Sequence, residues 1–154
     1  MSLSLRLANA NDAGLLWGWA NDPVCRNNAF DSNPIEWEAH IKWLDQKLSA
    51  PDCRIWILEK DGKPVGQIRY DRKRKCAEID FTVAPEARGR GLGTTLLKLS
   101  APEACDVLQV EKLIGFVKQD NRPSVRAFER AGFRQAETVM RAGGLCFKFE
   151  HACE

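Results

Sequence analysis

The sequence lacks several features that would place it in a common functional class. Its formal net charge is only +2 over 154 residues, so bulk charge does not favour nucleic acid or an anionic membrane surface as a partner. No apolar run approaches the length of a membrane span, and no signal-peptide pattern opens the chain. We therefore expect a cytoplasmic protein that has neither a nucleic-acid partner nor a membrane partner.

The chain also lacks the spacing of a metal site or of a disulfide framework. It has no Cys-x-x-Cys pair and only 2 histidines, whereas structural zinc sites need a full set of such ligands at short spacings. The sequence predicts no metal, and it predicts reduced thiols, which are usual in the cytosol. The cysteines are Cys25, Cys53, Cys76, Cys105, Cys146 and Cys153.

What is present is ordinary globular composition, with 44% apolar and 29% charged residues. A chain of 154 residues can bury a full core without covalent staples. No linker, internal repeat or low-complexity segment divides the sequence. We therefore expect a single domain over residues 1–154.

The most informative stretch runs from 83 to 97. The alternating run 77–83 predicts a strand, Pro85 stops that strand, and a leucine-rich helical pattern follows. Glycines between strand and helix let the backbone approach a ligand closely, and the helix N-terminus and two arginines add positive field. This arrangement predicts a site for a phosphate group, formed by Arg88, Gly89, Arg90, Gly91, Leu92, Gly93 and Thr94.

Two common phosphate motifs do not fit this stretch. The dinucleotide spacing Gly-x-Gly-x-x-Gly fails because Thr94 or Leu96 stands where its third glycine would be, and no Gly-Lys-Ser/Thr follows. The pattern Arg-x-x-Gly-x-Gly does fit, from Arg88 to Gly93. It resembles the acyl-coenzyme A pyrophosphate loop of the GNAT superfamily of N-acetyltransferases. The alternative from the residues alone is a tight turn with solvated arginines.

A second segment carries the same resemblance. Asn121-x-x-Ser124-x-x-x-Phe128-Glu129-x-x-Gly132-Phe133 resembles the family's Asn-x-x-Ala/Ser…Tyr-Glu-Lys-x-Gly-Phe helix. Periodicity predicts the element order β-α-α-β-β-β-α-β-α-β-β, which coincides with that of the family over residues 3–150. The resemblance implies the GNAT fold in the α/β (α+β) class, with a mixed, mostly antiparallel twisted sheet of about six to seven strands and helices on both faces.

Three local expectations accompany this element order. Pro23 ends a short helix over 13–20, and residues 25–33 are irregular. A longer helix starts within 32–34. Pro102 kinks or ends the helix that begins near Leu92, because its ring cannot join the helical hydrogen-bond ladder.

The resemblance implies an N-acetyltransferase that uses acetyl-CoA as cosubstrate and transfers the acetyl group directly to a primary amine. It implies that the pantetheine arm pairs with the backbone of 81–83, and that the N–H of Val83 stabilises the oxyanion. The residues it assigns to cofactor binding are Phe81, Thr82, Val83, Arg88, Gly89, Arg90, Gly91, Leu92, Gly93, Thr94, Asn121, Ser124 and Phe128.

Two carboxylates on the expected strand are candidates for taking the proton of the amine. Period-two alternation places Glu78 and Asp80 on one face, beside the glycine loop. Glu78 resembles the family's glutamate base in its position ten residues before Arg88. We therefore expect Glu78 as the main base, with Asp80 in support. The alternative is a solvent-facing strand edge with ordinary acids.

One position departs from the family pattern. Many members have a tyrosine at the position of Phe128, which protonates the departing thiolate, and phenylalanine cannot do so. The chain has 1 tyrosine, Tyr70, at the end of another predicted strand. Three explanations stay open: the thiolate leaves without a side-chain acid, water or Ser124 protonates it, or the protein is a non-catalytic coenzyme A-binding domain.

Two short motifs point to an acceptor. The segments 17–22 (Trp-x-Trp-Ala-Asn-Asp) and 40–44 (His-x-x-Trp-Leu) resemble the branch that N-acetylates nucleotide-linked 4-amino sugars in pseudaminic acid biosynthesis. The resemblance implies a nucleotide sugar as the small-molecule acceptor. The alternative acceptor is the N-terminal amine of a ribosomal protein. Both a monomer and a homodimer are compatible with the sequence.

Three residues are expected to bind that acceptor. Arg26 can pair with its phosphates, Trp43 can form an aromatic wall, and His40 can hydrogen-bond a hydroxyl group. In the alternative interpretation, Trp43 packs in the core while His40 and Arg26 belong to the solvated surface.

Overall fold

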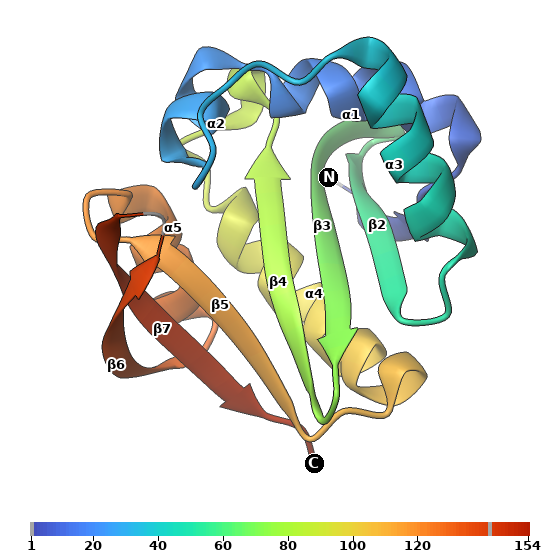
Figure 1. Ribbon diagram of the computed structural model, residues 1–154. Helices are drawn as coiled ribbons and strands as arrows, with labels where there is room; N and C mark the ends of the chain where they lie inside the picture. Colours follow the sequence, from blue (N-terminus) through green and yellow to red (C-terminus); the bar gives the residue numbers. More distant parts are fainter. Residues whose placement is uncertain (1, 142) are drawn as a thin grey trace.

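The computed structural model describes residues 2–141 and 143–154, so Met1 and Ala142 of the expected domain lie outside the described residues. Its sheet has seven strands in the order β1-β2-β3-β4-β5-β7-β6 (Figure 1). The neighbouring pairs are antiparallel except β4 and β5, which are parallel. This confirms the mixed, mostly antiparallel sheet. The strands are β1 (Leu3–Leu7), β2 (Cys53–Lys60), β3 (Lys63–Lys73), β4 (Cys76–Val83), β5 (Lys112–Lys118), β6 (Arg134–Arg141) and β7 (Gly144–Ala152).

Helices cover both faces of the sheet, as alternate residues of β3 show. The hydroxyl of Tyr70 lies 2.7 Å from that of Ser100 on α4, whereas Asp71 accepts from Lys47 on α3 at 2.7 Å. Successive strand residues point to opposite faces, so α3 and α4 lie on opposite sides. The helices are α1 (Ala13–Ala20), α2 (Pro23–Asn28), α3 (Trp37–Ser49), α4 (Leu92–Leu108) and α5 (Arg122–Arg130), with short 3₁₀ turns η1 (Ala10–Asp12) and η2 (Pro85–Ala87).

The expectation of irregular backbone over 25–33 is wrong for residues 25–28 and is confirmed for residues 29–33. Pro23 begins α2, and the carboxylate of Asp22 caps this helix by accepting from the Cys25 N–H at 3.2 Å. Asp followed by Pro is a helix-start signal, because proline at the first helical position loses no hydrogen bond. The helix expected to start within 32–34 begins later, at Trp37.

Pro102 was expected to kink or end the helix, and it does not end it, because α4 continues through it from Leu92 to Leu108. Buried residues lie on both sides of the proline, and their packing holds the helix together across the missing hydrogen bond. They are Leu92, Leu96, Leu97, Ser100, Ala101, Ala104 and Leu108.

The expectation of six reduced thiols is also wrong. Cys105 on α4 and Cys153, just after β7, form a disulfide across a sequence separation of 48 residues. Spacing along the chain does not show which distant elements pack together, so this pair could not be predicted from the sequence. Four cysteines stay free, namely Cys25, Cys53, Cys76 and Cys146.

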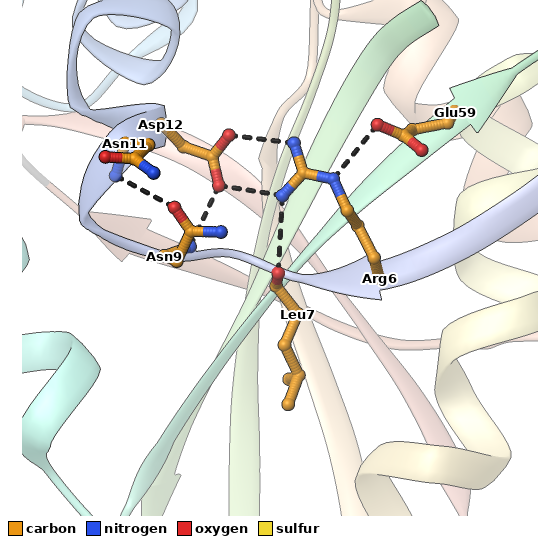
Figure 2. A network of polar contacts seen from close by, with 6 residues as sticks. All are labelled: Arg6, Leu7, Asn9, Asn11, Asp12 and Glu59. Atoms are coloured by element: carbon orange, nitrogen blue, oxygen red, sulfur yellow. Dashed lines mark hydrogen bonds and ion pairs between the residues drawn. The ribbon is translucent and has the colours of Figure 1, made fainter. Parts of the chain in front are cut away.

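A polar network fixes the N-terminal end of the chain to the sheet (Figure 2). Arg6 on β1 donates to both carboxylate oxygens of Asp12, at 2.9 and 2.8 Å, and to Glu59 on β2 at 3.0 Å. The Arg6 guanidinium and the Asn9 N–H, which donates at 2.8 Å, hold the pKa of Asp12 below its usual value. The network therefore fixes the position at which α1 starts. Because α1 leads into α2, the network also helps to position the part of the chain that covers the site described below.

Candidate active site

The site lies where β4 and β5 separate (Figure 1). The two strands pair only through Cys76–Ile79 and Lys112–Gly115. Beyond these residues β4 stays paired with β3 as far as Val83, and β5 stays paired with β7 as far as Lys118. A cavity of about 870 Å³ opens between them, lined by residues of both strands and of the surrounding helices.

The free edge of β4 offers backbone donors to this cavity. The N–H of Ala84 donates to Val65 of β3 at 2.8 Å. Successive N–H groups of a strand point to opposite sides, so the N–H groups of Val83 and Phe81 face the side from which β5 has departed. These are the backbone groups to which the family resemblance gives the acyl arm and the oxyanion.

The glycine loop adopts a backbone that favours glycine. Gly89 and Gly91 have φ angles of 80° and 75°, and Gly91 is the N-cap of α4. A side chain at either position would meet open space, so the constraint is the backbone angle. The first N–H groups of α4 have no acceptor within the helix, and this loop lines the cavity through Arg88, Gly89, Gly91, Leu92, Gly93 and Thr94.

The two arginines of the loop differ in their surroundings. Arg88 lines the cavity and donates to Asp22, the N-cap of α2, at 2.8 Å. Burial raises the pKa of Asp22, but Arg88 and the local N–H groups outweigh it, so the net pKa is lowered. Arg90 is exposed and lies outside the described cavity lining. Arg88 therefore joins the loop to the segment that covers the cavity.

The α5 motif supplies one wall. Asn121 caps α5 by accepting from the Ser124 N–H at 3.4 Å, and both residues line the cavity. Phe128 lines it too but is only 2% exposed. Its ring stacks on Phe149 at 5.2 Å and meets Phe81 edge-on at 5.6 Å.

The structure separates the two candidate carboxylates. Asp80 lines the cavity, and its Oδ2 accepts from Gln67 Nε2 at 3.4 Å. Glu78 is outside the described lining; it accepts from Lys73 at 2.7 Å and lies 3.7 Å from Arg141. The two residues do lie on one face of β4, as predicted. Only Asp80 lies beyond Ile79, where the pairing of β4 with β5 ends.

Arg69 is a site residue that we did not predict from the sequence. It lies opposite Asp80 in the β3–β4 register, with Nη1 3.7 Å from Asp80 Oδ2. Its Nε donates to Asp71 at 2.8 Å, and its guanidinium lies 4.9 Å from the centre of a Trp43 ring. The detectable signal was cross-strand pairing of opposite charges between β3 and β4, across the turn at Arg74 and Lys75.

The predicted acceptor residues come together at the cavity, each with partners of its own. His40 is buried, with Nε2 3.1 Å from the Ala13 carbonyl, and burial lowers its pKa. Its ring stacks on Trp43 at 5.8 Å. Arg26 lines the cavity while it donates to carbonyl oxygens of its own segment, at Ala20 (2.6 Å), Asp31 (2.9 Å) and Asn33 (3.1 Å).

Comparison with known families agrees with this geometry. Residues 2–134 match the family described as the acetyltransferase (GNAT) domain. The chain belongs to this family. It is 31% identical over 110 residues to an uncharacterised N-acetyltransferase of Methanocaldococcus jannaschii, covering 65% of this chain and 46% of that protein. The chain thus spans less than half the length of that GNAT relative.

Two further relatives have more specific names. Spermidine N(1)-acetyltransferase of Escherichia coli is 26% identical, over 80% of this chain and 62% of that protein. Acetyltransferase PseH of Campylobacter jejuni is 19% identical, over 93% of this chain and 90% of that protein. These identities support the GNAT assignment and leave the pseudaminic acid branch to a proposal.

Solved structures show the same fold. Aminoglycoside acetyltransferase AAC(6')-Ib in complex with coenzyme A superposes with a TM-score of 0.83 at 20% identity, over 98% of this chain and 95% of that chain. Ribosomal-protein-alanine N-acetyltransferase from Brucella melitensis gives a TM-score of 0.83 at 24% identity, over 97% and 99%. At such identities the likeness confirms the GNAT fold.

Two properties of residues 2–141 and 143–154 bear on other functions. No helix there is both long and apolar enough to cross a bilayer. In the same residues, no group of three or more His, Cys, Asp or Glu side chains is arranged to hold a metal ion.

Proposed function

We propose that this protein transfers an acetyl group from acetyl-CoA to a primary amine, with Asp80 taking the proton of the amine. One observation carries the proposal: Asp80 is the single carboxylate among the described cavity-lining residues, and it lies on the strand whose free N–H groups face the same space. The base and the oxyanion donor thus come from residues 80 and 83 of β4.

The backbone groups that line the cavity suit an acyl-coenzyme A. The N–H groups at the start of α4 suit the pyrophosphate, since a helix N-terminus with left-handed glycines before it binds anions. The unpaired edge of β4 beyond Ile79 suits an extended arm that carries its own amide groups. When bound, acetyl-CoA supplies the activated thioester, so the chain needs no nucleophile of its own.

The residues of β4 then have separate tasks. The N–H of Val83 donates to the oxygen that gains negative charge during transfer. The carboxylate of Asp80, held by Gln67 and faced by Arg69, orients the amine and accepts its proton. Glu78, which was expected from the sequence to be the base, lies in the part of β4 that is still paired with β5 and forms an ion pair with Lys73.

The departing thiolate has no tyrosine to protonate it, since Phe128 occupies that position. Ser124 lines the cavity and carries a hydroxyl group. Cys25 lines it as well, and burial raises the pKa of its thiol. Because a thiolate is a good leaving group at neutral pH, water or Ser124 is sufficient to complete the transfer.

The charges of the cavity bear on the acceptor. Positive side chains outnumber the one carboxylate, which disfavours a polycation and favours an acceptor that carries negative charge besides its amine. We therefore keep a nucleotide-linked amino sugar as the proposed acceptor, with Trp43 as an aromatic wall. The positive lining residues are Arg26, Arg69, Arg88, Lys118, Arg126 and Arg130.

A steady-state assay of thiol release from acetyl-CoA tests this function. The acceptor panel is a nucleotide-linked 4-amino sugar, spermidine, kanamycin and a peptide with a free N-terminal alanine. The proposal expects the highest kcat/KM with the nucleotide sugar. Binding of coenzyme A without turnover of any amine would instead support the non-catalytic domain that Phe128 allows.

A further inference from the structure

One wall of the cavity is a lightly anchored segment, residues 23–36. This segment comprises α2 and the chain that leads to α3, and all of its residues are described. None of them is buried, although Val24, Cys25, Ala29 and Phe30 line the cavity. In Figure 1, α2 lies above the gap between β4 and β5. A cavity wall with so little buried surface opens easily.

The segment is tied to the N-terminal half of the fold at both ends. At the first end, the guanidinium of Arg26 donates to the Ala20 carbonyl and, within the segment, to the Asp31 carbonyl. Ile35 accepts from the indole of Trp17 at 2.8 Å, and its N–H donates to Asn21 at 2.8 Å. Around Phe30, the backbone is tied only within the segment, where the Asp31 carbonyl accepts from Arg26 at 2.9 Å.

The middle is held from the other side of the cavity by Arg141, at the end of β6. The guanidinium carbon of Arg141 lies 5.0 Å from the ring centre of Phe30 and 4.2 Å from that of Phe116 on β5. Both phenylalanines line the cavity. A second tie runs from Lys118 Nζ to the Asn27 carbonyl at 3.3 Å.

Glu78 is the counter-ion of Arg141 in this contact. Its Oε1 lies 3.7 Å from Arg141 Nη1, while its Oε2 accepts from Lys73. A guanidinium held by a carboxylate keeps its planar face free for aromatic rings. Glu78, Arg141 and Phe30 therefore form a chain of contacts from β4, through β6, to the segment over the cavity.

We propose that Arg141 is a positioning residue for the acceptor wall: it holds segment 23–36 closed by bridging Phe30 to Phe116, with Glu78 as its counter-ion. The inference rests on the proposed function only in naming this wall as the acceptor side. Opening the bridge frees Phe30 and widens the entrance, and closing it brings two aromatic side chains against a bound acceptor. Glu78 thereby has a structural task that fits its place outside the cavity.

Hydrogen exchange of the full chain without ligand tests the bridge directly. Each exposed cation–π contact stabilises the closed arrangement by roughly two- to fivefold in its equilibrium constant. Arg141→Ala should therefore make the peptide covering 24–36 exchange about fivefold faster. Arg134→Ala is the matched control, because Arg134 lies on the same strand, is 73% exposed and bonds Glu150 instead. The control should leave that peptide unchanged.

A double-mutant cycle separates the bridge from a general loosening of β6. In a Phe30→Leu background, Arg141→Ala should add little further exchange, because the aromatic partner is already gone. Arg141→Lys should restore part of the protection. Equal exchange in Arg141→Ala and wild type, or full additivity with Phe30→Leu, would overturn the proposal.

Kinetics provide the functional readout if the enzyme turns over. Arg141→Ala should raise KM for the acceptor severalfold and leave KM for acetyl-CoA unchanged. An equal rise in both constants would contradict a role in the acceptor wall. Because the exchange experiment needs no turnover, failure of the proposed activity and failure of the bridge are distinguishable.

Discussion

The ring of Phe128 occupies the space that a β-carbon at Gly115 would take. An ideal β-carbon there would lie 2.6 Å from Phe128 Cε1, far inside contact distance. Gly115 is also the last residue of β5 that pairs with β4. Phe128 thus packs into the point where the two strands separate, and this packing accounts for glycine at 115 and helps to hold the cavity open.

We expect Gly115→Ala to lower the free energy of unfolding by about 1–3 kcal/mol, as overpacking of a dense core does. Gly18→Ala on α1 is the control, because a β-carbon at Gly18 meets nothing within 4 Å. Alanine there should be neutral or stabilise by up to about 1 kcal/mol. Urea denaturation measures both; equal stabilities of the two variants would contradict the packing argument.

The glycine loop should act through its backbone. Gly91→Val should weaken acetyl-CoA binding far more than Arg90→Ala, because φ of 75° strains any branched side chain and shifts the first turn of α4. Arg90 is exposed and outside the described cavity lining. Calorimetric titration with acetyl-CoA measures the two affinities. Small, equal losses would show that the loop does not hold the pyrophosphate.

Acid should destabilise the fold through Asp12. The folded-state pKa of this carboxyl is lowered from 3.8, mainly by its bond to Arg6. Its stabilisation is therefore fully present above that value and is lost as pH falls through the folded pKa. Asp12→Asn should be less stable than wild type at neutral pH by about 2 kcal/mol or more.

That difference should shrink as the pH falls below 3.8 and through the lowered folded-state pKa of Asp12. Asp45→Asn is the control, because Asp45 is exposed on α3, and it should follow wild type at every pH. A stability difference for Asp12→Asn that does not change between neutral and acid pH would show that the ion pair is not its cause.

The disulfide should stabilise the C-terminal half of the fold. Replacing Cys105 with Ser removes a link that closes a loop of 48 residues, which should cost about 2–4 kcal/mol. Cys76→Ser, at a free and half-buried thiol, controls for the loss of sulfur. A reducing agent should lower the melting temperature of wild type but not that of Cys105→Ser. Identical melting curves for wild type with and without reductant would contradict the link.

Much of the fold could be predicted from the sequence because its signals are local. The Asp61-Gly62 turn has the positive φ angles, 52° and 82°, that such a pair favours. The glycine loop between β4 and α4 was recognisable for the same reason. The helix that Pro23 starts was missed, and the helix does not end at Pro102, because a proline starts a helix or survives inside one according to the capping and packing around it.

The site was less predictable because it depends on contacts between distant strands. Period-two alternation correctly placed Glu78 and Asp80 on one face, but it does not show where β4 and β5 part. The cross-strand neighbour Arg69 and the bridge from Arg141 come from register and from the β6–β7 hairpin. The cysteine pair at 105 and 153 lies beyond sequence reasoning for the same physical reason.

The central claim is that Asp80, and not Glu78, accepts the proton of the amine. Turnover of the two isosteric variants, Asp80→Asn and Glu78→Gln, tests it most directly, measured with the best acceptor and saturating acetyl-CoA. Loss of a general base should lower kcat by roughly a hundredfold or more in Asp80→Asn. Glu78→Gln should stay within about threefold of wild-type kcat, with its main effect on KM for the acceptor. A hundredfold loss in Glu78→Gln, with Asp80→Asn near wild type, would contradict the account.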